Sequence, residues 1–115
     1  MRIKIYHNPR CSKSRQTLQL LEEKNAQLEV VEYLKQVPSK TELSSVLSLL
    51  GLSPRDLMRK GEAVYNELGL SDENLSNEAL IKAMLENPIL IERPIVLANG
   101  KAAIGRPPES VLDIL

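Results

Sequence analysis

The only cysteine of this 115-residue chain, Cys11, lies where an apolar N-terminal run ends and a helical pattern begins. The positively charged or titratable side chains near it are His7, Arg10, Lys13 and Arg15. A thiol at a strand-to-helix junction among such side chains can be held partly as thiolate, its nucleophilic form. A helix N-terminus supplies at most about 2 kcal/mol, whereas lowering a thiol pKa by about two units takes ~2.7 kcal/mol. We therefore hypothesise that Cys11 is a low-pKa nucleophile and that neighbouring cations supply the remainder.

Other interpretations of these residues stay open at this point. A lone cysteine is often inert, and His7 could be a structural residue at the end of a strand. One cysteine and one histidine cannot complete a four-ligand zinc site without carboxylates, so we expect no metal. Ser14 stands where a Cys-x-x-Cys pair has its second thiol. If Cys11 is a catalytic nucleophile that must be regenerated, the resolving thiol must therefore come from outside the protein.

Two arginines stand directly before prolines, at Arg93-Pro94 and Arg106-Pro107. The residue before proline is pushed into extended geometry, so both arginines should lie at segment ends where side chains can project into a cleft. Guanidinium groups match tetrahedral oxyanions with paired hydrogen bonds. Singly, each arginine could be an ordinary surface residue, but in combination with Cys11 they predict an oxyanion site.

The spacing of apolar residues predicts the order of elements along the chain. It indicates strand, helix and strand over residues 2–6, 11–24 and 28–33, then helices over 39–88, a hairpin over 94–104 and a terminal helix from 107. Strands separated by a helix favour parallel pairing, and Asn99-Gly100 suits a tight hairpin turn. We expect an α/β, thioredoxin-like βαβ…ββα fold with an all-helical insertion at about residues 37–88, forming a single domain over residues 1–115.

Composition narrows the possible partners and compartment. Lys+Arg and Asp+Glu are both 15, and Phe and Trp are absent, so neither a basic patch nor aromatic stacking favours nucleic acid. We expect no membrane partner, because no apolar run approaches the ~20 residues that span a bilayer. The N-terminus does not look like a signal peptide. A single cysteine suits the reducing cytoplasm.

Several ordered motifs together resemble the glutaredoxin-dependent arsenate reductases from about residue 3 to the C-terminus. The motifs are Tyr6-His7-Asn8-Pro9-x-Cys11-x-x-Ser14-Arg15, Leu57-Met58-Arg59-Lys60, Leu68-Gly69-Leu70, residues 87–96 and the ending from Arg106-Pro107. The resemblance implies a thioredoxin-like fold and reduction of arsenate to arsenite without a bound cofactor. It departs at Ser12 and Lys13, where the well-characterised enzymes have Gly-Thr, and Lys13 adds a cation to the first helical turn.

The same resemblance assigns roles to individual residues. Cys11 would attack arsenic, His7 would help to lower the pKa of the thiol, and Ser14 and Arg15 would support the site. The arsenate would be held by Arg59, Arg93 and Arg106. Pro94 would correspond to the cis-proline that faces the active-site cysteine of thioredoxin-like folds. Glutathione would be the co-substrate and glutaredoxin the protein partner.

Two other functions fit the family pattern. Non-enzymatic relatives bind RNA polymerase and regulate transcription, but they tend to carry a Cys-x-x-Cys switch, which Ser14 interrupts here. A general monothiol reductase of glutathione mixed disulfides would also use Cys11, and its activity would not depend on Arg59, Arg93 and Arg106.

Overall fold

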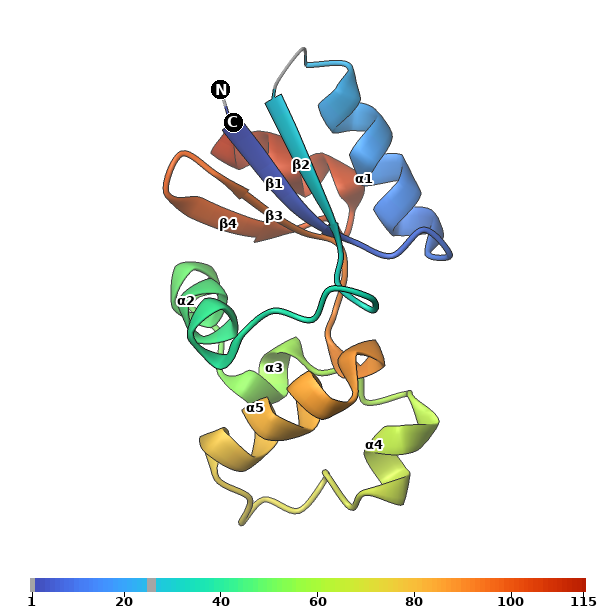
Figure 1. The fold of residues 1–115 in the computed structure, drawn as a ribbon, viewed down its shortest axis with the longest axis vertical. Helices are drawn as coiled ribbons and strands as arrows, with labels where there is room; N and C mark the ends of the chain where they lie inside the picture. Colours follow the sequence, from blue (N-terminus) through green and yellow to red (C-terminus); the bar gives the residue numbers. More distant parts are fainter. Residues whose placement is uncertain (1, 25–26) are drawn as a thin grey trace. The chain divides into compact units, whose positions relative to one another are not determined.

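Parallel and antiparallel strand pairs build one mixed sheet in the order β2-β1-β3-β4 (Figure 1). The computed structural model describes residues 2–24 and 27–115. In it β1 (Arg2–His7) pairs in parallel with β2 (Gln27–Glu32) and antiparallel with β3 (Ile95–Ala98), which pairs antiparallel with β4 (Lys101–Ile104). Helix α1 (Ser12–Glu22) connects the two parallel strands. The predicted βαβ unit, the C-terminal hairpin and the α/β class are confirmed.

The chain divides into two compact units, Met1–Gln36 with Arg93–Leu115, and Val37–Glu92. The first unit contains the whole sheet, and the second contains α2 to α5. The expectation that residues 1–115 form a single domain, with an insertion at about 37–88, stays a prediction.

The core of the first unit follows from alternation along the strands. Ile3, Ile5 and Val96 point to one face and are buried. There they pack with Leu21 of α1 and with Val111 of the C-terminal helix η2 (Pro108–Ile114). Figure 1 shows both helices on the same side of the sheet. This packing fixes α1, and with it the N-terminal end that carries Cys11.

The C-terminal hairpin has the tight turn that the sequence predicts. Asn99 and Gly100 both adopt left-handed backbone conformations, with φ of 55° and 71°. Such a turn matches the right-handed twist of the flanking strands. The terminal helix that follows is present, but it is a 3₁₀ helix that begins after Pro107.

Helices make up most of the second unit. They are α2 (Lys40–Leu50), α3 (Pro54–Leu57), α4 (Ala63–Glu67), α5 (Asn77–Glu86) and the 3₁₀ helix η1 (Pro88–Leu90). The side chains of Ser39, Ser53 and Ser76 accept hydrogen bonds from the first turns of α2, α3 and α5. These caps define the starts of the three helices, because each satisfies an N–H group that lacks a partner within its helix.

Short extended segments after α3 and η1 are paired within the second unit. Met58 and Ile91 form an antiparallel bridge. The Arg59 N–H donates to Leu90 O at 2.7 Å, and the Glu92 N–H donates to Leu57 O at 2.9 Å. These bonds fix the backbone of Arg59, one of the predicted site residues.

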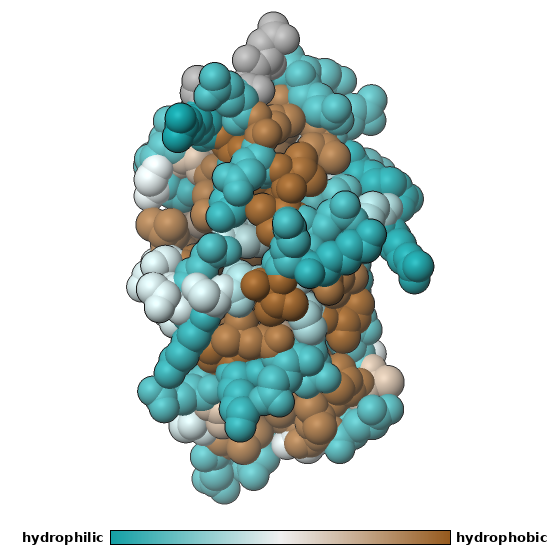
Figure 2. Space-filling model, viewed as in Figure 1, coloured by the Kyte–Doolittle hydropathy of each residue, from teal (hydrophilic) through white to brown (hydrophobic). Residues whose placement is uncertain are grey.

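The visible surface is chemically mixed. Figure 2 shows hydrophilic side chains spread over the visible face, interspersed with hydrophobic ones. Across residues 2–24 and 27–115, none of the helices has the length and apolar character needed to cross a bilayer.

Candidate active site

A short loop between β1 and α1 presents the thiol of Cys11. Cys11 is the N-cap residue of α1, in an extended conformation, and is partly exposed. Its N–H donates to Asn8 O, and the Arg10 N–H donates to Asn8 Oδ1, both at 3.0 Å. Asn8 is itself buried. The loop is therefore held in a turn that places the sulfur at the N-terminus of the helix.

Arg93 and Arg106 both contact the sulfur. The Arg106 Nη2 lies 3.3 Å from Cys11 Sγ, and its Nε donates to Arg93 O at 2.8 Å. The Arg93 side chain is also hydrogen-bonded to the sulfur. Arg93 is 8% exposed, whereas Arg106 is exposed. The predicted combination of Cys11 with these two arginines is therefore present as a contact.

The surroundings of Cys11 favour its thiolate form. Partial burial alone raises the pKa of the Cys11 thiol, because it penalises the charged form. Four groups act in the opposite direction, and together they bring the pKa of Cys11 below its ordinary value. In order of size they are the Ser14 N–H, the Arg93 side chain, the Arg106 charge and the Lys13 N–H. Backbone N–H groups in the first turn of a helix act on an anion in this way because they have no partner within the helix.

His7 is held through Ser14. The Nδ1 atom of His7 lies 2.6 Å from Ser14 Oγ, which also accepts from the Asn8 N–H at 3.0 Å. Burial lowers the pKa of His7, the Glu32 carboxylate opposes this in part, and the Arg15 charge lowers the pKa further. His7 is therefore uncharged near neutral pH. It is not one of the groups that lower the pKa of Cys11.

The cations nearest in sequence act differently from our expectation. Arg15 lies in α1, and its Nη1 donates to Pro9 O at 2.9 Å. Neither Arg10 nor Arg15 is a source of the lowered Cys11 pKa, and Lys13 contributes through its backbone N–H. The guanidinium of Arg15 is bonded to the Pro9 carbonyl, while Arg106 reaches the sulfur from the end of the hairpin.

Pro94 and Pro107 follow cis peptide bonds. Both Arg93-Pro94 and Arg106-Pro107 are cis. The cis state of the first bond is the isomer that the resemblance implies. Pro94 O accepts a hydrogen bond from the Gly105 N–H at 3.0 Å, so the residues next to the two arginines are joined.

Arg59 belongs to the second unit, where it is paired with carboxylates. Its Nη1 lies 2.8 Å from Glu92 Oε1, and its Nε lies 3.6 Å from Glu62 Oε1. The side chains of Arg59 and Glu92 are 27% and 26% exposed. The role of Arg59 as a third arginine for arsenate stays a prediction.

Three further residues shape the site, although the sequence analysis gave none of them a role there. Asn8 organises the loop, Thr17 is fully buried behind the first helical turn, and Gly105 lies against Thr17 and Pro94. The Asn8-Pro9 pair was a usable signal, because such pairs often begin turns. No sequence pattern identifies the contact of Thr17 with Gly105, because it joins elements far apart in the chain.

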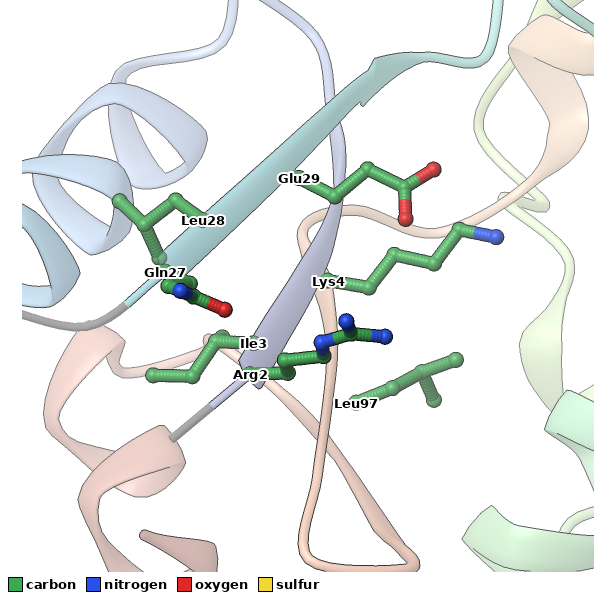
Figure 3. Close-up of a pocket in the computed structure, with 7 residues that line it drawn as sticks. All are labelled: Arg2, Ile3, Lys4, Gln27, Leu28, Glu29 and Leu97. Carbon is green, nitrogen blue, oxygen red and sulfur yellow. The ribbon is translucent and has the colours of Figure 1, made fainter.

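A hollow of about 300 Å³ lies elsewhere on the sheet. Figure 3 shows the side chains that line it. Its lining includes Arg2, Lys4 and Glu29, near the start of β1 and β2. Cys11 follows the opposite end of β1, so this hollow is separate from the thiol site. In the described part of the chain, no group of three or more His, Cys, Asp or Glu residues is arranged to hold a metal ion.

Comparison with known proteins places this geometry in a family. A protein-family model described as the ArsC family matches residues 6–114. The chain belongs to the ArsC family. It is 54% identical to an arsenate reductase of Neisseria meningitidis serogroup A, over 98% of this chain and 97% of that protein. It is 59% identical to YfgD of Escherichia coli K12, which bears the name of an uncharacterized protein, over 98% of this chain and 96% of that one.

Solved structures of the ArsC family share the fold. An arsenate reductase from Vibrio cholerae superposes with a TM-score of 0.97 at 53% identity, covering 100% of this chain and 98% of that one. The mixed sheet with flanking helices is therefore the thioredoxin-like α/β fold of ArsC proteins, as the sequence predicted.

Proposed function

We propose that this ArsC protein reduces arsenate to arsenite, with the Cys11 thiolate as nucleophile. The observation that carries the proposal is the contact of Arg106 with the Cys11 sulfur at 3.3 Å, together with the hydrogen bond from Arg93. Relatives named arsenate reductases, at 54% and 49% identity over nearly the whole chain, support the choice of substrate.

The first step is attack of the Cys11 sulfur on arsenic. The thiolate supplies the electron pair for the S–As bond, and one arsenate oxygen leaves as water after taking up protons. The arsenic remains pentavalent in this adduct, so no electrons have yet been transferred. A lowered thiol pKa favours this step because it raises the fraction of thiolate near neutrality.

The arginines stabilise the negative charge of arsenate and of the adduct. Guanidinium groups of Arg93 and Arg106 lie at the sulfur, where the arsenate oxygens must arrive. Preorganised donors of this kind lower the barrier because they require little rearrangement during the reaction. Arg59 is the third arginine of the proposal, and the bond from its N–H to Leu90 O holds its backbone in place.

Reduction of arsenic needs a second thiol, which we assign to glutathione. Cys11 is the only cysteine, and Ser14 occupies the place of a resolving thiol. Glutathione attacks the adduct, the two sulfurs give up two electrons, and trivalent arsenite leaves with a Cys11–glutathione mixed disulfide remaining. Glutaredoxin then reduces this disulfide and restores the thiol. The cytoplasm, which keeps thiols reduced, is the compartment that suits this cycle.

The direct test is to supply the purified protein with arsenate, glutathione and glutaredoxin and to measure arsenite. We expect product from the wild type and none from Cys11→Ser, while Ser12→Ala at the neighbouring exposed position serves as the matched control. Omission of glutathione or glutaredoxin should stop turnover. Reduction of a glutathione mixed disulfide without any arsenite formation would contradict the proposal and favour a general monothiol reductase.

A further inference from the structure

Gly105 occupies a space in which no side chain fits. It is buried, and a Cβ atom built on it would lie 2.7 Å from Pro94 Cγ and closer still to Thr17 Oγ1. Its φ is outside the left-handed region, unlike those of Gly51, Gly69 and Gly100. Lack of space, rather than backbone conformation, therefore calls for glycine at this position.

The walls of this space cannot move freely. Thr17 is fully buried, and its Oγ1 donates to Lys13 O at 2.8 Å, one turn earlier in α1. Pro94 is buried, and its carbonyl accepts from the Gly105 N–H at 3.0 Å. An added methyl group would therefore push residue 105 away from α1 instead of displacing the wall.

Arg106, the next residue, depends on where Gly105 lies. Its Nε donates to Arg93 O at 2.8 Å, and its Nη2 contacts Cys11 Sγ at 3.3 Å. A hydrogen bond weakens as its donor and acceptor separate or lose their alignment, so a shift of the backbone at residue 106 weakens both contacts. One peptide unit joins Gly105 to Arg106. The contact of Arg106 with the sulfur therefore depends on how close Gly105 lies to α1.

We propose that Gly105 is a positioning residue, whose missing side chain lets the hairpin end lie close enough to α1 for Arg106 to reach Cys11. In this role Gly105 acts only through Arg106. The inference deepens the proposed function, on which it rests for the use of this thiol in catalysis.

The test compares Gly105→Ala with Gly61→Ala in the full-length protein. Gly61 has no atom within 4 Å of an added Cβ and no left-handed φ, so its variant is the matched control. The measurement is the rate of alkylation of Cys11 by iodoacetamide as a function of pH, which follows the thiolate. We expect the midpoint of Gly105→Ala to rise by about one pH unit, because the partly exposed thiolate loses an arginine partner. Below the midpoint, this shift corresponds to a thiolate fraction that is about tenfold smaller. The Gly61→Ala midpoint should equal that of the wild type.

A second variant separates positioning from a general loss of structure. Thr17→Ala removes one wall of the space, so Thr17→Ala/Gly105→Ala should recover part of the shift. The contact with Pro94 remains, so the midpoint of the double variant should still lie above that of Thr17→Ala alone, by a smaller amount. If Gly105→Ala does not fold, the comparison of Thr17→Ala/Gly105→Ala with Thr17→Ala serves as the test. An unchanged midpoint in a folded Gly105→Ala, or in the double variant relative to Thr17→Ala, would overturn the inference.

The titration does not involve arsenate, so the two proposals can fail separately. If wild-type protein forms no arsenite but Gly105→Ala shifts the midpoint, the proposed function fails and the positioning role stands. If arsenite forms and the midpoint does not move, the positioning role fails and the proposed function stands.

Discussion

The Arg106 Nη2 donates to the Cys11 sulfur at 3.3 Å, although 95 positions separate the two residues. The hairpin of β3 and β4 makes this contact possible, because it returns the chain to the end of β1 where the thiol lies. The ionisation of an N-terminal cysteine is thus controlled by the C-terminal part of the chain.

Replacing either arginine should raise the pKa of Cys11. Arg106→Ala and Arg93→Ala each remove a positive group from the thiolate, and we expect a rise of about one unit for each. The backbone carbonyl of Arg93, which accepts from Arg106, is retained in Arg93→Ala. Thiolate absorbance or alkylation against pH measures the effect. Arg2→Ala, an exposed arginine at the far end of β1, is the control. Equal midpoints in all four proteins would show that the arginines do not stabilise the thiolate.

The thiol site was largely predictable because its local parts are contiguous in sequence. The end of a strand, the Asn8-Pro9 pair and a helix start fall within a few residues, and together they place Cys11 at a helix N-terminus. The source of its lowered pKa was less accessible. Arg10 and Arg15 are near in sequence, but the structure assigns the effect to Arg93 and Arg106 and to backbone N–H groups. Such a contact depends on strand register, which the pattern of residues does not give in detail.

The same limit applies to His7. Its sequence position suggested a cation beside the thiol, whereas its burial and its contact with Ser14 make it a neutral partner of the loop. The order of the elements was predicted well, because the spacing of apolar residues and the Asn99-Gly100 turn are local signals.

Removing the Ser14 hydroxyl should destabilise the fold. In Ser14→Ala, the buried Nδ1 of His7 and the N–H of Asn8 lose their common partner. Buried polar groups left unpaired cost about 1–3 kcal/mol. Urea unfolding measures the change in the free energy of unfolding, and Ser12→Ala in the same helical turn, at an exposed position, is the control. A loss in Ser14→Ala no larger than that in Ser12→Ala would contradict the role of the hydroxyl.

His7 should make the protein less stable in mild acid. Its folded-state pKa lies below the ordinary value of 6.5, so the unfolded chain takes up a proton at a higher pH than the folded one. The stability that comes from keeping His7 uncharged is therefore complete above about pH 6.5 and is lost as the pH falls through the folded-state pKa. Over this range the free energy of unfolding falls by up to about 1.4 kcal/mol per pH unit.

The His7 contribution can be isolated by comparing slopes. The free energy of unfolding is measured at pH 7.5, 6.5, 5.5 and 5.0, values chosen around the ordinary pKa of histidine of about 6.5. His7→Gln should lose less stability than the wild type over this range, whatever its absolute stability. Parallel pH profiles would mean that His7 titrates normally in the folded protein.

Arg59 should matter more for turnover than for stability. Its ion pair with Glu92 is about one-quarter exposed, at 27% and 26% for the two side chains, so Arg59→Ala should change stability by only about 1 kcal/mol or less. If Arg59 binds arsenate, turnover should fall by roughly 10²–10³, the loss typical of a missing oxyanion donor. Lys82→Ala, which breaks the exposed pair with Glu86, is the control. Turnover equal to that of the control would remove Arg59 from the proposed site.

The register of the hairpin also shows where the protein can carry additional sequence. The separation of the two arginine–proline pairs depends on the pairing of Ile95 with Ile104 at the open end of the hairpin. The Asn99-Gly100 turn lies at the closed end and is exposed. Each doubling of a flexible loop costs only about 0.6 kcal/mol. A fluorescent or affinity label grafted into this turn would therefore report on the protein while leaving the sulfur chemistry at the other end intact.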